Sequence, residues 1–189
     1  MKNFKLLSLL GIVLVAGVFL VWCENKANEE TNNDVVIEDA TDAVIDYNDA
    51  LVDLAYDCIS SEDTIWAAYN SEELDVEGIQ SAISNTISQC SSAINQIETL
   101  GDWEWDSSLK DGVVVLLQKD IEYYEKLGET VPYLAIPEEE LTEEQATMYD
   151  TLITEIDNIN QELEDANTNL IAIQDQFAID HGYELEDAE

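Results

Sequence analysis

Apolar side chains recur every three or four residues over most of the chain that follows residue 35. The first of these runs extends from Ile37 to Ala68, and the last extends from Tyr149 to Phe177. This spacing lines up apolar residues along one side of a helix, which then packs against other helices. Sustained period-two alternation, which would indicate strands, is missing from the sequence. The pattern therefore predicts an all-α protein.

Four helical segments follow from the apolar pattern and from the residues that bound it. The two prolines, Pro132 and Pro137, are expected in the connection between the third and fourth segments, where they break no helix. We expect a four-helix, mostly antiparallel bundle over residues 35–183, in which the long first and fourth helices form the main pair. The predicted segments are 35–69, then Val76–Leu100 closed by Gly101, then 106–127 closed by Gly128, and a fourth opened by the capping box Thr142–Gln145.

The first 22 residues have a different composition from the rest of the chain. Lys2 and Lys5 precede a run of 17 residues without charge, which ends at Trp22. A basic start before an apolar run is typical of an export signal. As a helix the run would span roughly 25 Å, at the lower limit for crossing a bilayer. We therefore expect residues 1–22 to be a signal peptide or membrane anchor that directs the remainder outside the cytoplasm.

Cys23 stands where the apolar run ends, and three fates are open for it. Leu20-Val21-Trp22-Cys23 is similar to the short box that precedes the lipidated cysteine of bacterial lipoproteins, although Trp22 replaces its usual small residue. Alternatively, the segment stays uncleaved as an anchor with Trp22 at the membrane interface. Cleavage by an ordinary signal peptidase is the third fate, but a small-x-small site is lacking. Residues 23–34 then form a flexible acidic tether, and residues 184–189 an acidic tail.

The charge of the chain excludes several kinds of partner. It has 43 acidic residues and six lysines, with a formal net charge of −37. Such a surface repels phosphate backbones, so we expect no nucleic-acid binding. Six aspartates also form a stripe on the solvent side of the first helix. They would associate weakly and non-specifically with divalent cations, or simply be solvated, because hard cations need converging oxygens. The stripe comprises Asp39, Asp42, Asp46, Asp49, Asp53 and Asp57.

The sequence contains no arrangement of residues that indicates an enzyme. The single histidine, His181, precedes Gly182 at the end of the fourth helix, where a cation is favoured by the helix dipole. The spacings of metallohydrolase, phosphate-loop, nucleophile-elbow and EF-hand motifs do not occur. We therefore predict a protein without catalytic residues, metal or cofactor.

Cys58 and Cys90 both lie in apolar seams, at equal distances from the connection between the first two helices. In an antiparallel hairpin they would stand at the same height, and an exported domain is oxidised where its compartment allows. Two thiols that simply fill the core are the alternative. We predict a disulfide between them.

Aromatic residues gather at the two ends of the expected bundle. Trp103 and Trp105 fall before the third helix, on the tether side, while Trp66, Tyr69 and Tyr133 fall toward the opposite end. When exposed, such residues grip a partner or stack on sugars; when buried, they close the ends of a core. These five residues form a possible binding surface.

Short motifs at the two ends of the bundle complete the sequence evidence. Tyr47-Asn48-Asp49 lies in the long first helix, and Phe177-Ala178 precedes Gly182-Tyr183-Glu184-Leu185. In these features the chain resembles small exported helical-bundle surface lipoproteins of bacteria, a group without assigned activity. We expect a cell-envelope protein, held to the membrane by a lipid or anchor, that is structural or contacts an envelope or extracellular protein. The alternative is a sensor-like or solute- or cation-binding bundle.

Overall fold

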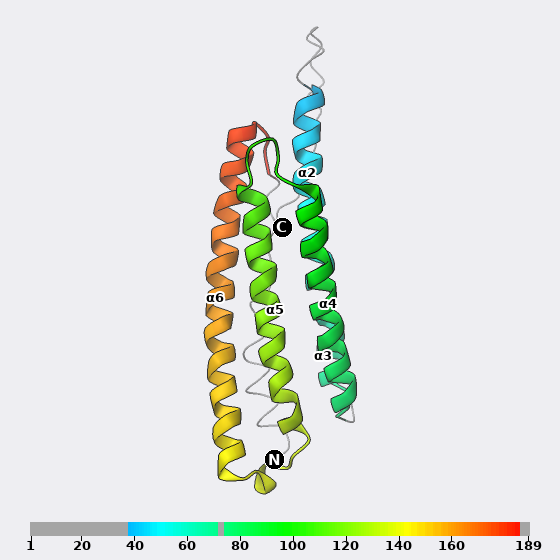
Figure 1. Cartoon of the computed structure of the whole chain (residues 1–189), viewed down its shortest axis with the longest axis vertical. Helices are drawn as coiled ribbons and strands as arrows, with labels where there is room; N and C mark the ends of the chain where they lie inside the picture. The colour runs from blue at the N-terminus through cyan, green and yellow to red at the C-terminus, as the bar shows by residue number, and fades with distance from the viewer. Residues whose placement is uncertain (1–37, 72–73, 186–189) are drawn as a thin grey trace.

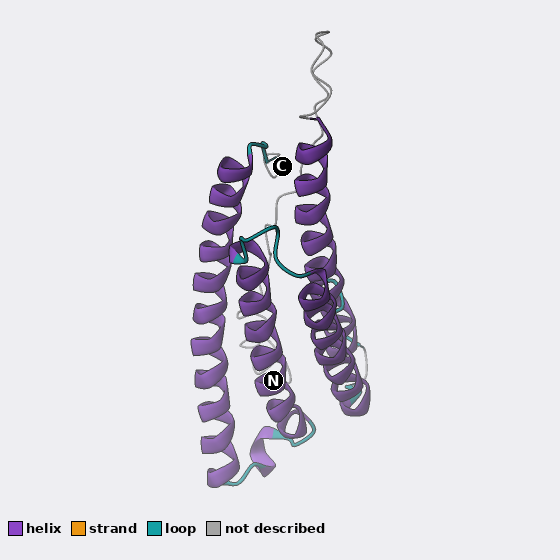
Figure 2. Ribbon diagram, turned by 45° about the horizontal axis from the view of Figure 1, so that its top comes forward, coloured by secondary structure: helices purple, strands orange, loops and turns teal. Residues whose placement is uncertain are grey.

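The structure, a computed structural model, describes residues 38–71 and 74–185. The predicted leader, Cys23 and most of the acidic tail therefore lie outside the described residues. The described part is all helical apart from short loops and turns (Figures 1 and 2). The elements are α2 (Glu38–Ile59), α3 (Glu62–Tyr69), α4 (Val76–Leu100), α5 (Ser108–Leu134), the 3₁₀-helix η1 (Glu138–Glu140) and α6 (Glu143–His181).

The prediction of an all-α, mostly antiparallel bundle is confirmed. α2 and α3 run along α4, α4 packs on α5, and α5 packs on α6 (Figure 1). The start of α2, the loop between α4 and α5 and the end of α6 lie together at one end of the bundle, called here the entry end. With 39 residues, α6 is about 58 Å long and is the longest of the described helices.

The prediction that the first and fourth helices form the main pair is wrong. α6 runs beside α5 for most of its length, and α2 runs beside α4 (Figure 1). Near the entry end α2 does reach α6, where the buried Gln174 amide donates a 2.8 Å hydrogen bond to the buried Asn48 side chain. Short connections place consecutive helices side by side, and this decides the pairing.

The first predicted helix is interrupted at Ser60–Ser61, so that α2 and α3 are separate helices. The Ser61 hydroxyl donates a 2.6 Å hydrogen bond to the Cys58 carbonyl, and the Thr64 hydroxyl donates to the Ser61 carbonyl at 2.7 Å. Serine and threonine hydroxyls compete in this way with the backbone hydrogen bonds of a helix. The serine pair thus ends α2, although the apolar spacing continues into Ile65.

The predicted stop of the third helix at Gly128 is also wrong. α5 continues to Leu134 and contains Pro132, which the sequence had placed in a connection. Burial of Thr130 and Val131 keeps this last stretch packed against the core. Pro132 itself lies on the exposed side and only two residues before the helix ends, where few backbone hydrogen bonds remain to be lost.

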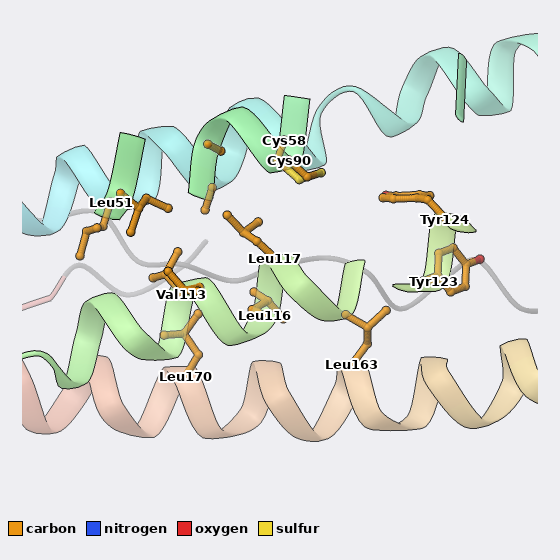
Figure 3. Close-up of a cluster of buried hydrophobic side chains, with 14 of the residues drawn as sticks. Leu51, Cys58, Cys90, Val113, Leu116, Leu117, Tyr123, Tyr124, Leu163 and Leu170 are labelled. Atoms are coloured by element: carbon orange, nitrogen blue, oxygen red, sulfur yellow. A yellow bond between two sulfur atoms is a disulfide. The ribbon is translucent and has the colours of Figure 1, made fainter. Parts of the chain in front are cut away.

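The predicted seams form the core of the bundle. Almost all of the apolar positions expected to face inward are buried or half-buried, with Leu100 as the exposed exception. Figure 3 shows Leu116 and Leu117 of α5 directed into the space between the helices. α5 and α6 approach closely at Gly112, where a Cβ atom would lie 3.0 Å from a methyl group of Leu170. The largest fully buried side chains are Tyr124, Phe177, Leu51, Ile65, Ile79, Ile97, Leu109, Leu116, Leu117, Leu127, Ile156 and Leu170.

Two further local predictions are confirmed. Cys58 and Cys90 form a disulfide that joins the end of α2 to α4 (Figure 3). Closing this loop in the unfolded chain stabilises the fold by about 3.7 kcal/mol in the chain-entropy model. The capping box is present at the start of α6, where the Thr142 and Gln145 side chains each accept a hydrogen bond from the other's backbone N–H.

The lysines of α5 are all committed to ion pairs with neighbouring elements. Lys110 lies 2.6 Å from Asp102, which follows α4, while Lys119 and Lys126 pair with Glu162 and Glu155 of α6. The lysine side chains therefore connect α5 to its neighbours through ion pairs. Carboxylates dominate the remaining outer surface.

Candidate functional site

The connection between α4 and α5, residues 101–107, forms a compact turn that we call the tryptophan loop. Trp103 and Asp106 exchange backbone hydrogen bonds of 3.1 and 2.7 Å, and Gly101 and Glu104 adopt positive φ angles of 77° and 51°. The closed turn directs Trp105 away from the bundle, and this residue is 97% exposed. Tryptophan is enriched among the residues that contribute most to protein interfaces, and a hydrogen-bonded turn holds this side chain without further ordering.

Trp103 anchors the loop to the bundle. Its ring is half-buried and lies 5.5 Å from the ring of Tyr47 on α2, while the Tyr47 hydroxyl donates a 2.8 Å hydrogen bond to the Gly101 carbonyl. Burial raises the pKa of Tyr47 to about 12, so its hydroxyl stays a donor. The two tryptophans that the sequence grouped together therefore have opposite surroundings.

His181 also supports the tryptophan loop. It is the last residue of α6, and its Nε2 lies 3.4 Å from an Asp106 oxygen, while its ring packs 4.4 Å from that of Phe177. Desolvation raises the pKa of Asp106, but hydrogen bonds from Ser108 and His181 outweigh it and hold that pKa below its usual value. The expected place of His181 at the helix end is confirmed, and its contacts are structural.

The other three aromatic candidates lie toward the opposite end of the bundle, on α3 and at the end of α5. Tyr69 is buried, and Trp66 lies beside it with ring centroids 5.5 Å apart. Tyr133 is half-buried and packs 5.8 Å from the ring of Tyr149. Of the five aromatic candidates, Trp105 is thus the one that is fully presented to solvent.

An acidic side chain that the sequence analysis did not single out lies inside the bundle. Asp120 of α5 is 3% exposed, and its Oδ2 has no hydrogen-bond partner among the described residues. Burial, and after it the charge of Glu62, raises the pKa of Asp120 to about 7. A buried carboxylate without a donor or cation is costly, so about half of this group is protonated at neutral pH, where an ordinary aspartate is ionised.

Glu62 at the start of α3 is the second member of what we call the carboxyl pair. Its Oε1 accepts a 2.9 Å hydrogen bond from the indole N–H of Trp66, which lies four residues later on the same helix. Partial burial raises the pKa of Glu62, and the indole N–H of Trp66 and the hydroxyl of Tyr124 oppose the rise. Glu62 therefore has a hydrogen-bond donor, whereas Oδ2 of Asp120 has none among the described residues.

The acidic stripe of α2 faces solvent where the structure describes its side chains. Asp42, Asp46, Asp53 and Asp57 are exposed and Asp49 is half-buried. Across the described residues, no group of three or more histidine, cysteine or acidic side chains could hold a metal ion. The stripe therefore does not converge on a cation within this part of the chain.

The membrane prediction rests on residues outside the described part. Among the described helices, none combines the length and apolar character needed to cross a membrane. Comparison of the chain with protein-family models, curated proteins and solved structures finds no match.

The sequence analysis did not identify three of the polar residues that the structure buries, Asp120, Asn48 and Gln174. Asp120 lies three residues after Leu117 and four before Tyr124, so it occupies a seam position. Asn48 and Gln174 stand at seam spacing in α2 and α6 in the same way. The sequence did contain a signal for these residues, because each is a polar residue at a position where the seam spacing calls for an apolar one. A search for apolar residues alone does not detect such a position.

Proposed function

We propose that this protein is an exported, envelope-anchored acidic helical bundle that works through contact with another envelope or extracellular protein, and that it is not an enzyme. The export signal of residues 1–22 supports the location. The strongly negative chain supports a protein partner and argues against nucleic acid. The membrane is reached through a lipid on Cys23 or through the uncleaved leader.

The observation that carries the contact role is the presentation of Trp105. Its indole is exposed in water, although tryptophan is the residue whose burial contributes most to many protein interfaces. Trp103, Tyr47 and His181 hold the loop beneath it, so a partner would bind without first ordering the loop. The flanking carboxylates, Glu104 among them, favour a partner surface with an apolar pocket and a basic rim.

Site-specific photo-crosslinking in cells tests this role. A photoreactive phenylalanine replaces Trp105 in one strain and Tyr56 in the control, because Tyr56 is an aromatic residue that is 61% exposed on the side of α2. We expect a discrete protein adduct at position 105 that position 56 does not form. The absence of an adduct at 105, or equal adducts at both positions, would contradict the contact role.

The anchor is tested separately from the contact. Metabolic labelling with palmitate should mark the chain, and Cys23→Ser should abolish the label and the sensitivity of processing to globomycin. An unlabelled, uncleaved chain that stays in the membrane fraction would instead make residues 1–22 a membrane anchor. A chain recovered free of membranes in both strains would contradict envelope anchoring.

The carboxyl pair favours one alternative function, a sensor-like or cation-binding bundle. A buried carboxyl without a partner is a place where a cation or a proton changes the free energy of the fold. Thermal melts in millimolar Ca²⁺ and in NaCl of the same ionic strength distinguish the two functions. A larger rise of Tm in Ca²⁺ favours specific ion binding, whereas equal rises indicate screening of the negative surface.

A further inference from the structure

The tryptophan loop lies at the end of the bundle where the chain enters from its expected anchor. The Tyr47 hydroxyl donates a hydrogen bond to the Gly101 carbonyl and its ring packs on that of Trp103, so the loop is fixed to α2. Glu38, the first residue of α2, and Tyr47 are about 14 Å apart along the helix axis. The loop is therefore close to the point where the chain joins the bundle (Figure 1).

The opposite end of the bundle is much farther from this point. Met148, near the start of α6, lies about 50 Å along the helix from His181, whose ring is 6.4 Å from that of Trp103. A flexible linker of about 14 residues, the length of residues 24–37, spans roughly 20 Å, and a fully extended one about 50 Å. An anchor at Cys23 or in the leader therefore holds Trp105, on average, nearer to the bilayer than the far end of the bundle.

The entry end offers an apolar but small contact surface. Leu100 ends α4 and Ile179 lies near the end of α6, and both are exposed, as Trp105 is. Packed helices lie 8–10 Å apart, so the end of four helices measures roughly 20 Å across, or about 400 Å². A stable complex of two soluble proteins buries about 800 Å² on each partner. The entry end alone is therefore too small for a stable complex between freely diffusing proteins.

Confinement to one membrane supplies what the small contact area lacks. Two proteins held in the same bilayer meet at a raised effective concentration, which compensates for a weak contact without any additional contact area. A partner set in the bilayer also lies on the side of the bundle to which the anchor confines Trp105. A soluble partner has neither advantage.

The charges at the entry end argue against the lipid surface itself as the partner. Glu104 and Asp180 lie next to Trp105 and Ile179 in the sequence, and both are exposed. Anionic headgroups repel so acidic a chain, and insertion of the Trp105 indole among headgroups would draw Glu104 out of water at a cost. A protein surface can offset the same carboxylates with lysine or arginine.

We propose that the partner of Trp105 is an integral protein of the membrane that holds the anchor, contacted through an apolar pocket rimmed by lysine or arginine. The inference rests on the proposed function, because it takes the anchor and the contact role of Trp105 from there. It adds that the entry end, and not the far end of the bundle, meets the partner. It also adds that the partner is neither a soluble protein nor the bilayer.

Photo-crosslinking of the full, anchored chain distinguishes these partners. A photoreactive phenylalanine replaces Trp105 in one strain and Met148 in the control, because Met148 is an exposed apolar residue toward the far end. Mass spectrometry identifies the captured polypeptide from its peptides. We expect position 105, and not position 148, to capture a polypeptide whose sequence contains membrane-spanning segments.

The other outcomes separate this inference from the proposed function. Capture of a soluble protein at position 105, or of the same membrane protein equally at both positions, would overturn the inference and leave a protein contact standing. The absence of a protein adduct at position 105, or an adduct with phospholipid alone, would contradict both.

A longer tether tests the role of the anchor in the same cells. About forty glycine and serine residues inserted between Asn33 and Asp34 keep the anchor and the bundle but lower the effective concentration of Trp105 at the membrane. We expect the adduct at position 105 to fall roughly five- to tenfold. The same insertion after Glu189 should leave the adduct unchanged. An undiminished adduct with the longer tether, or an equal loss with the C-terminal insertion, would contradict a partner in the membrane.

Discussion

The tryptophan loop and the carboxyl pair place their most unusual side chains in opposite environments. The loop satisfies its backbone and polar atoms internally and turns one large apolar ring, that of Trp105, into water. The carboxyl pair does the reverse, since Asp120 places a titratable group in the core without a donor. The loop is therefore suited to contact with a partner, while the pair is suited to a response to protons.

The disulfide separates the two regions, and its removal should have the largest effect. Replacing Cys58 and Cys90 together with alanine lowers the free energy of unfolding by about 3.7 kcal/mol, because the unfolded chain gains loop entropy. Urea unfolding under oxidising conditions measures the loss. If α2 and α3 are held mainly by the disulfide, amide hydrogen exchange in α3 should rise far more than in the tryptophan loop. An equal rise in both would contradict the view that the disulfide separates the two regions.

Asp120 should make the fold more stable in acid than at neutral pH. Its pKa is raised to about 7 in the folded state and lies near 4 when unfolded, so the contribution is complete below about pH 4 and is lost as the pH rises to about 7. We expect the free energy of unfolding to fall by roughly 3 kcal/mol across this range. Denaturant titrations at each pH in 0.5 M NaCl, where surface repulsion is screened, measure it.

Asp120→Asn provides the matched comparison for that measurement. It should be as stable as, or more stable than, the natural chain at pH 7 and should lose most of the dependence on pH. A variant that is less stable at pH 7 and keeps the wild-type profile would show that the Asp120 carboxylate has a stabilising partner.

Substitutions of the two tryptophans of the loop should differ in their effect on the stability of the fold. Trp103→Ala removes a half-buried ring between Tyr47 and His181 and should destabilise the protein by about 2 kcal/mol. Trp105→Ala should change the stability by less than about 0.5 kcal/mol. Thermal unfolding of both variants checks this difference, and a large loss in Trp105→Ala would make that residue structural.

The smallest effect concerns the acidic stripe. Asp53 has like-charged neighbours four residues away on each side, Asp49 and Asp57, so Asp53→Asn should raise stability by about 0.2–0.5 kcal/mol for each relieved pair. The gain should vanish in high salt, unlike the effect of Asp120→Asn. Melting curves at low and high NaCl distinguish the two, and a gain that persists in salt would point to a different cause.

Much of the candidate chemistry could be located from the sequence, but its surroundings could not. The positions of Cys58 and Cys90 in the apolar seams predicted their disulfide, and the position of Trp103 and Trp105 before the third helix predicted their place at the entry end. Which of the two rings is exposed depends on a turn closed by Asp106 and on Tyr47, which lies more than 50 residues earlier in the chain. Local patterns contain no information on contacts of that kind.

The sequence by itself determined the elements of this protein and the character of its surface. Three properties of the chain are local: the apolar seams with a period of three and four residues, the helix caps at Thr142 and Gly182, and the excess of carboxylates. Neighbouring residues alone define the backbone geometry or the charge through which each of them acts. Tertiary structure decided the extension of α5 through Pro132 and the pairing of α6 with α5. It also decided that Asp120 faces inward beside Glu62, because burial and pairing are properties of the packed helices together.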